Sequence, residues 1–177
     1  MMLLTAKHVV AELLPAAIVG GEWVPILDAK NNYFAGKVHE KPPGVLDAVL
    51  IEPTPVISRS DPNYSAFTPP AVVTVGDAVE LQLRSQASVA AKVVEINPLA
   101  NVPFSKTPPN LQAAQIIFDQ YGQDGDSGSL IVDKASSNGV ALYVGDLDLT
   151  KVGGTIRGVG QYLGQVAEAM NVELLKE

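Results

Sequence analysis

The stretch "GQDGDSGSLIV", residues 122–132, decides the fold of this chain. It places two aspartates, three glycines and two serines in a short turn that runs directly into an apolar segment. Glycines let a backbone turn tightly and approach a substrate closely, and an oxyanion is well stabilised by backbone N–H groups. The pattern therefore predicts a turn that presents Ser127 as a nucleophile, with the N–H groups of Gly125 and Ser127 as oxyanion donors. The alternative is an ordinary β-turn with solvated aspartates.

A serine nucleophile needs an adjacent base, and the chain has two histidines. His8 lies in "LLTAKHVV", residues 3–10, where an apolar strand leads into a small-residue turn that ends at the imidazole. His39 lies in "GKVHEKP", a polar stretch typical of the surface. His8 is therefore the candidate base.

A histidine base needs a carboxylate that orients the ring and stabilises the imidazolium. Asp47 in "VLDAVLIE", residues 45–52, precedes an apolar strand, so its carboxylate can point inward at the strand start. Taken alone, Asp47 is as well explained as a turn residue that begins a strand. His8, Asp47 and Ser127 each lie beside a β-type run, and this shared context favours a common site.

Composition and charge restrict the class of protein. Of the 177 residues, 47% are hydrophobic and 18% charged, which predicts a folded core rather than disorder. Short valine runs, 15 glycines and 13 prolines favour an all-β chain. The net charge of -7 argues against nucleic acid or an anionic membrane as a partner. Without cysteine there is no disulfide, thiolate metal site or cysteine nucleophile, and no apolar run is long enough to span a membrane.

The chain divides into two halves joined by a proline-rich linker. Residues 1–52 form the first half, and residues 53–70 hold five prolines, which oppose both strand pairing and helix continuation. Residues 71–177 form the second half, which we expect to be a β-barrel with a closing helix. No internal repeat interrupts this organisation.

Within the second half, alternation and turn signals predict a series of strands followed by a helix. Asn138-Gly139 is a turn signal between the two strands of a hairpin. Tyr162, Val166 and Met170 recur every four residues and predict one face of the helix. The expected strands are 71–83, 88–96, 111–121, 127–133, 139–146 and 155–160, and the expected helix is 161–175.

These motifs resemble those of chymotrypsin/trypsin-like serine peptidases of the cysteine-free bacterial type. "LLTAKHVV" resembles their histidine motif, "LDAVLIE" their aspartate motif and "GDSGSLIVD" their nucleophile motif, and the three follow the same chain order. "VGDAVELQLRSQASVAAKVVEI" resembles the strand pair that opens the second barrel, and "GQYLGQVAEAMNVELL" resembles the C-terminal helix. The resemblance covers nearly the whole chain.

The resemblance implies an all-β, chymotrypsin-like double β-barrel with a C-terminal α-helix and a site in the cleft between the barrels. His8 would be the general base, Asp47 would orient it, and Ser127 would form an acyl-enzyme. Gly125 and Ser127 would hold the oxyanion, and Asp126 would brace the turn. The resemblance implies neither a metal nor another cofactor.

The resemblance also places the substrate-binding residues on two segments: Tyr121, Tyr143, Val144 and Gly145. Tyr121 stands six residues before the nucleophile, where the base of the specificity pocket lies in this family. Because Tyr121 is not acidic, we expect a small or apolar side chain before the scissile bond rather than arginine or lysine. The alternative is a basic residue before the scissile bond, which Asp124 and Asp146 near the rim of the pocket would favour.

The start of the chain departs from the family pattern, because the first barrel has about two more strands before its histidine. Four explanations fit: a misassigned gene start, a fragment of a longer protein, strands donated by another chain, or loss of peptidase activity. The first barrel is therefore expected to be incomplete in this chain.

The sequence leads us to expect a serine endopeptidase that acts on a peptide or protein substrate. A non-catalytic, protease-like module that binds peptide or pairs its open edge with a partner is the alternative, and an esterase or other acyl hydrolase is the third. The compartment stays open, although the lack of a recognisable signal peptide favours the cytoplasm. Substrate, regulation and oligomeric state are not encoded in these motifs.

Overall fold

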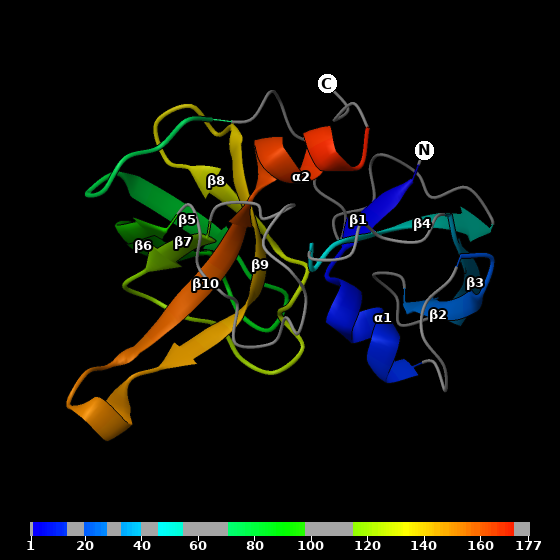
Figure 1. The fold of residues 1–177 in the computed structure, drawn as a ribbon, viewed down its shortest axis with the longest axis horizontal. Helices are drawn as coiled ribbons and strands as arrows, with labels where there is room; N and C mark the ends of the chain where they lie inside the picture. The colour runs from blue at the N-terminus through cyan, green and yellow to red at the C-terminus, as the bar shows by residue number, and fades with distance from the viewer. Residues whose placement is uncertain are drawn as a thin grey trace.

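The structure is a computed structural model that describes residues 2–13, 20–27, 33–39, 46–54, 71–97 and 115–171. Its first half contains a four-stranded antiparallel sheet in the order β1-β4-β3-β2. A short helix, α1, follows the first strand and lies beside the sheet (Figure 1). The elements of this half are β1 (Leu3–Thr5), α1 (Lys7–Leu13), β2 (Trp23–Leu27), β3 (Tyr33–Val38) and β4 (Val49–Thr54).

The second half is a closed barrel of six antiparallel strands in the order β10-β7-β6-β5-β8-β9. Its strands are β5 (Ala78–Gln82), β6 (Val89–Asn97), β7 (Gln115–Phe118), β8 (Leu130–Asp133), β9 (Gly139–Asp148) and β10 (Ile156–Tyr162). A single 3-10 turn, η2 (Thr150–Val152), lies between β9 and β10, and the helix α2 (Leu163–Ala169) follows the barrel. In the described ranges, no helix is long and apolar enough to cross a membrane.

The barrel forms because each of its strands either alternates buried and less buried side chains or buries both of its faces. In β5, Val79 and Leu81 are fully buried while Ala78 is exposed, which is the period of two that a half-buried strand requires. β7 and β8 lie deeper, so their apolar residues are buried almost without interruption. The barrel core gathers Val73, Val79, Leu81, Leu83, Ala91, Val93, Ile116, Phe118, Ile131, Val140, Ala141 and Tyr143.

An apolar cluster joins the two halves. Leu46, Ala48 and Leu50 of the first half pack against Leu142 on β9 and against α2. Figure 1 shows α2 lying between the barrel and β1. Burial of these apolar side chains holds one half of the chain against the other. The residue between Leu46 and Ala48 therefore has a set position relative to the barrel, and that residue is Asp47.

The all-β class, the barrel and the C-terminal helix agree with the sequence analysis, but the helix begins later than expected. β10 continues to Tyr162, and the Tyr162 hydroxyl donates a hydrogen bond to the Ala71 carbonyl oxygen at 2.7 Å. The Tyr162 side chain packs on the barrel core, whereas Val166 and Met170 pack in the cluster between the halves. Placing Tyr162 on the helical face was therefore wrong, and the last residues of the expected helix lie outside the described part of the chain.

The turn between β8 and β9 also differs from the expectation based on Asn138-Gly139. The Asp133 carboxylate accepts hydrogen bonds from the Ser136 N–H at 2.9 Å and the Ser136 hydroxyl at 2.6 Å. This local pairing starts the turn directly after β8, and Ser137 takes the left-handed backbone with φ +59°. The Asp133 N–H then reaches the Asn138 carbonyl at 2.9 Å, so Asn138 closes the loop rather than forming its tip.

The division into two halves and a linker stays a prediction. β4 runs to Thr54, two residues beyond the expected end of the first half, and pairs with β3 over that length. Residues 55–70 of the expected linker lie outside the described ranges.

Candidate active site

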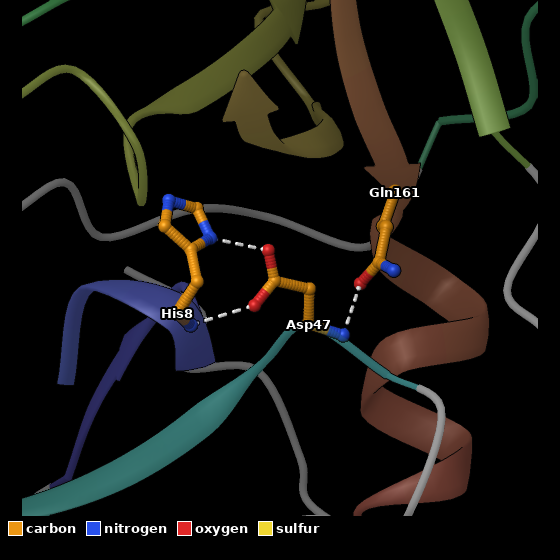
Figure 2. A network of polar contacts seen from close by, with 3 residues as sticks. All are labelled: His8, Asp47 and Gln161. Carbon is orange, nitrogen blue, oxygen red and sulfur yellow. Dashed lines mark hydrogen bonds and ion pairs between the residues drawn. The ribbon is translucent and has the colours of Figure 1, made fainter. Parts of the chain in front are cut away.

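His8 and Asp47 lie against each other although 39 positions separate them in the chain. β1 ends at Thr5 and α1 begins at Lys7, so His8 stands in the first turn of the helix. One Asp47 carboxylate oxygen lies 2.5 Å from His8 Nδ1, and the other accepts the His8 backbone N–H at 2.8 Å (Figure 2). Two contacts to one residue fix both the position and the tilt of the imidazole, and Nε2 points away from the carboxylate (Figure 2).

The pair is partly shielded from solvent. The Asp47 side chain is 13% exposed and the His8 side chain 34%. Lys7, beside His8 in the chain, is half-buried, and burial lowers the pKa of its ammonium group while the nearby Asp47 carboxylate raises it. The Asp47 carboxylate therefore faces two basic side chains in a region where water screens charges only in part.

Gln161 anchors the backbone of Asp47 to the second barrel. Its side chain is nearly fully buried at the end of β10, and its Oε1 accepts the Asp47 N–H at 3.1 Å (Figure 2). The sequence offered no signal for this residue, because a glutamine at a strand end carries no motif. Asp47 is thus held by side-chain contacts to one half and a backbone contact to the other.

Replacing Gln161 with alanine is expected to lower the free energy of unfolding by about 1–3 kcal/mol, because the Asp47 N–H loses its acceptor in a poorly solvated place. Urea unfolding of the parent and the variant measures this difference. The exposed Gln86, on the loop between β5 and β6, gives a matched glutamine-to-alanine control, expected to change stability by less than about 0.5 kcal/mol. Equal effects of the two variants would contradict an anchoring role for Gln161.

The serine turn, residues 122–128, is braced through Asp126. This side chain is fully buried, and its carboxylate accepts three hydrogen bonds. The Ser85 N–H and hydroxyl donate at 2.8 and 2.6 Å, and the Gln123 N–H donates at 2.8 Å. The bracing role expected for Asp126 thus has a definite geometry, while its partner Ser85, on the loop between β5 and β6, carried no sequence signal.

The first part of the serine turn is a type II turn. The Asp126 N–H donates to the Gln123 carbonyl at 3.0 Å, and Gly125 has φ +93°. A positive φ at the third position is the mark of this turn type and explains the glycine. Among the backbone hydrogen bonds of turns and loops in the described ranges, none uses the N–H of Gly125 or Ser127 as donor.

Gly128 brings the serine turn against the segment that carries His8. It has φ +93°, and a Cβ built on it would collide with the Thr5 hydroxyl and lie 3.3 Å from the Ala6 nitrogen. Thr5 and Ala6 immediately precede the first turn of α1. Ser127, half-buried, is the neighbour of Gly128, so the expected nucleophile and the expected base belong to segments in van der Waals contact.

Replacing Gly128 with alanine is expected to destabilise the protein by more than about 1–2 kcal/mol, the cost of a left-handed backbone alone, because the new methyl group also meets Thr5. Gly153 is the control, since it has φ +79° and nothing within 4 Å of an added Cβ. Chemical denaturation should show the larger loss for Gly128→Ala. If both variants lose the same stability, the contact between the turn and Thr5 is not a constraint.

The fold can be compared with known proteins, although no family model and no curated protein matches the sequence. Among solved structures, a glutamic acid specific serine protease aligns with TM-score 0.66 and 16% identity over 98% of this chain and 86% of its own. Cellulomonas bogoriensis chymotrypsin aligns with TM-score 0.63 and 14% identity, over 98% and 85%. The chain has the chymotrypsin-like fold. The HtrA-type protease AlgW with decapeptide aligns with TM-score 0.64 and 16% identity over 96% of this chain, which spans 47% of the AlgW chain.

In this chymotrypsin-like fold, β9 lies beside the serine turn, and the assignment of Tyr143 to substrate binding stays a prediction. The Tyr143 carbonyl accepts the Gly128 N–H at 2.8 Å, and the Tyr143 N–H donates to the Ser129 carbonyl at 2.9 Å. Tyr121, the other expected pocket residue, is 44% exposed. The two tyrosines thus lie in opposite environments, one in the barrel core and one at the surface.

Val144 and Gly145 continue β9 past the serine turn. Successive side chains on a strand point to opposite faces, so Val144 packs away from Tyr143, in a cluster with Ile117 and Val159. Gly145 has φ +143°, and nothing lies within 4 Å of an added Cβ. Any contact of Val144 with a substrate would therefore involve its backbone.

Proposed function

We propose that this chain is a serine endopeptidase domain in which Ser127 is the nucleophile, His8 the general base and Asp47 the residue that orients the base. The observation that carries the proposal is the double contact between Asp47 and His8. It is the arrangement that a histidine base needs, because it fixes the tautomer and stabilises the imidazolium. The contact of Gly128 with Thr5 supports the assignment by joining the segments of base and nucleophile.

The chemistry follows from these roles. Ser127 Oγ attacks the peptide carbonyl carbon while His8 Nε2 takes the hydroxyl proton. The carbonyl oxygen becomes an oxyanion and is held by the N–H groups of Gly125 and Ser127. Collapse of the tetrahedral intermediate breaks the C–N bond, and His8 gives its proton to the leaving amine. Water then attacks the acyl-enzyme with His8 again as base, which releases the acid and restores Ser127.

The proposed substrate is a peptide or an unfolded protein segment. The support is the shared fold with proteases, one of which was solved with a decapeptide. Apart from water, the proposed mechanism uses only side chains and backbone N–H groups of this chain and calls for no cofactor.

A fluorophosphonate probe tests the proposal directly, because it reacts with a serine only when a base and an oxyanion site activate it. The expected result is one adduct per chain by intact mass, located on Ser127 by fragmentation of the labelled peptide. An adduct on the nearby Ser129, or no adduct, would contradict the proposal, and the second outcome would favour the non-catalytic peptide-binding module. Matched ester and amide substrates then separate a peptidase from an acyl hydrolase.

A further inference from the structure

The side chain of Tyr143 spans the inside of the serine turn. Its backbone is hydrogen-bonded to Gly128 and Ser129, which follow Ser127. Its hydroxyl accepts the Gly122 N–H at 2.7 Å, at the other end of the turn. The same hydroxyl donates a hydrogen bond to the Asp146 carboxylate. The side chain is 1% exposed, so it is held at both ends in a place that water does not reach.

Two glycines flank the tyrosine ring. A Cβ built on Gly122 would lie 3.2 Å from one ring carbon, and a Cβ built on Gly158 of β10 would lie 3.1 Å from another. Neither glycine has a positive φ that would explain its presence. A Cβ on Gly122 would also lie 2.9 Å from the Asp126 carboxylate, and one on Gly158 would lie 2.5 Å from the Gln120 carbonyl oxygen, so both glycines stand where the serine turn, β10 and the ring approach closely. We call the space between the serine turn and β10 that the Tyr143 ring fills the slot.

The slot matters because of where the acyl group of a substrate must lie. Its carbonyl carbon bonds to Ser127 Oγ, and its carbonyl oxygen points to the N–H groups of Gly125 and Ser127. The side chain of the residue before the scissile bond begins at its Cβ, two bonds from the carbonyl carbon, and so also lies beside the serine turn. A long side chain therefore needs a hollow there, and the inside of the turn is occupied by Tyr143.

We infer that Tyr143 is a specificity-determining residue, whose ring closes the slot beside Ser127 and restricts the residue before the scissile bond to glycine, alanine or serine. This inference rests on the proposed function. The expected preference for a small residue before the scissile bond then depends on one buried ring, and not only on the lack of an acidic side chain at Tyr121.

The polar end of the slot predicts what removal of the ring would admit. Burial raises the pKa of Asp146, and the neighbouring Asp124 and Asp126 carboxylates raise it further, while the hydrogen bond from Tyr143 lowers it. Burial and the bond to Asp146 raise the pKa of the Tyr143 phenol, so the ring stays neutral. Without the ring, the slot would end at a carboxylate, which attracts a cationic side chain.

The experiment measures kcat/KM on three peptide amides that differ only in the residue before the scissile bond: alanine, phenylalanine or lysine. The parent protein is expected to cleave the alanine peptide about 100-fold faster than the other two, because a filled slot rejects a large group. Tyr143→Phe keeps the ring and should keep this ratio. Tyr143→Ala should raise the lysine-to-alanine ratio about 100-fold and the phenylalanine-to-alanine ratio less.

Two results would overturn the inference. One is a parent protein that cleaves the phenylalanine or lysine peptide as fast as the alanine peptide, a measurement that needs no variant. The other is a folded Tyr143→Ala protein with the parent's ratios. If that variant is poorly folded, p-cresol should refill the vacated slot, raise its Tm and suppress cleavage of the phenylalanine peptide.

Fluorophosphonate labelling separates this inference from the proposed function. Labelling of Ser127 with a substrate preference independent of Tyr143 would remove the inference and leave the peptidase assignment. A parent protein that neither labels nor cleaves any of the three peptides would remove both.

Discussion

Replacement of Ser127 by alanine is expected to lower kcat on an alanine-containing peptide amide about 10⁶-fold, with little change in KM. In the proposed mechanism the hydroxyl oxygen forms the acyl-enzyme, so its loss leaves only oxyanion stabilisation and binding. Among the residues that the structure describes, Ser85 and Gln123 hold Asp126 in place without the Ser127 side chain, so the variant should keep its fold. Steady-state hydrolysis by the variant, checked for contaminating protease, measures the effect.

Ser129 provides the matched control for Ser127. Its backbone N–H donates to the Asp126 carbonyl at 3.0 Å, and its carbonyl accepts the Tyr143 N–H, whereas its side chain makes no hydrogen bond within the described ranges. Ser129→Ala should therefore retain activity close to that of the parent. A Ser127→Ala protein as active as Ser129→Ala would show that the hydrolysis arises elsewhere.

Replacement of Asp47 by asparagine is expected to lower kcat about 10⁴-fold at neutral pH. The amide nitrogen would face His8 Nδ1 and donate to it, so the imidazole would carry its proton on Nε2, the atom that must accept one from Ser127. Asparagine has the size of aspartate, so the contact to the His8 N–H and the bond from Gln161 remain possible. The rate of acyl-enzyme formation with an activated ester measures the loss.

Asp77 supplies the comparison for Asp47. Its carboxylate accepts the Thr74 N–H and hydroxyl in an exposed turn far along the chain from the proposed site. Asp77→Asn should leave the rate of acylation at the parent's level. An Asp47→Asn protein within tenfold of the parent would mean that Asp47 does not set the tautomer of the base.

The parts of the site that local chemistry determines could be predicted from the sequence. The serine turn needs glycine where φ is positive, and Gly125 and Gly128 both take that backbone. Strands such as β5 follow from alternation, which is a property of the strand itself. The placement of Asp47 at the start of an apolar strand also follows from its immediate neighbours.

The parts that depend on closure of the barrel could not be predicted. Gln161 meets Asp47 across 114 positions, and Ser85 meets Asp126 across 41. The sequence shows that Asp47 and Asp126 need hydrogen-bond partners. Which residues supply them is decided by the fold. Tyr143 is a third case. The resemblance placed it among the substrate-binding residues, which stays a prediction, while its hydrogen bonds to Gly122 and Asp146 depend on how β9 meets the serine turn.

The apolar cluster between the halves has a consequence for how tolerant the protein is to change. His8 and Asp47 belong to one half and Ser127 to the other, and the cluster of Leu46, Ala48 and Leu50 with Leu142 and α2 is the material that holds them in register. Proton transfer tolerates displacements of well under an ångström. In the proposed reaction, the alignment of base and nucleophile therefore depends on apolar side chains, and on the packing of a helix at the opposite end of the sequence from the base.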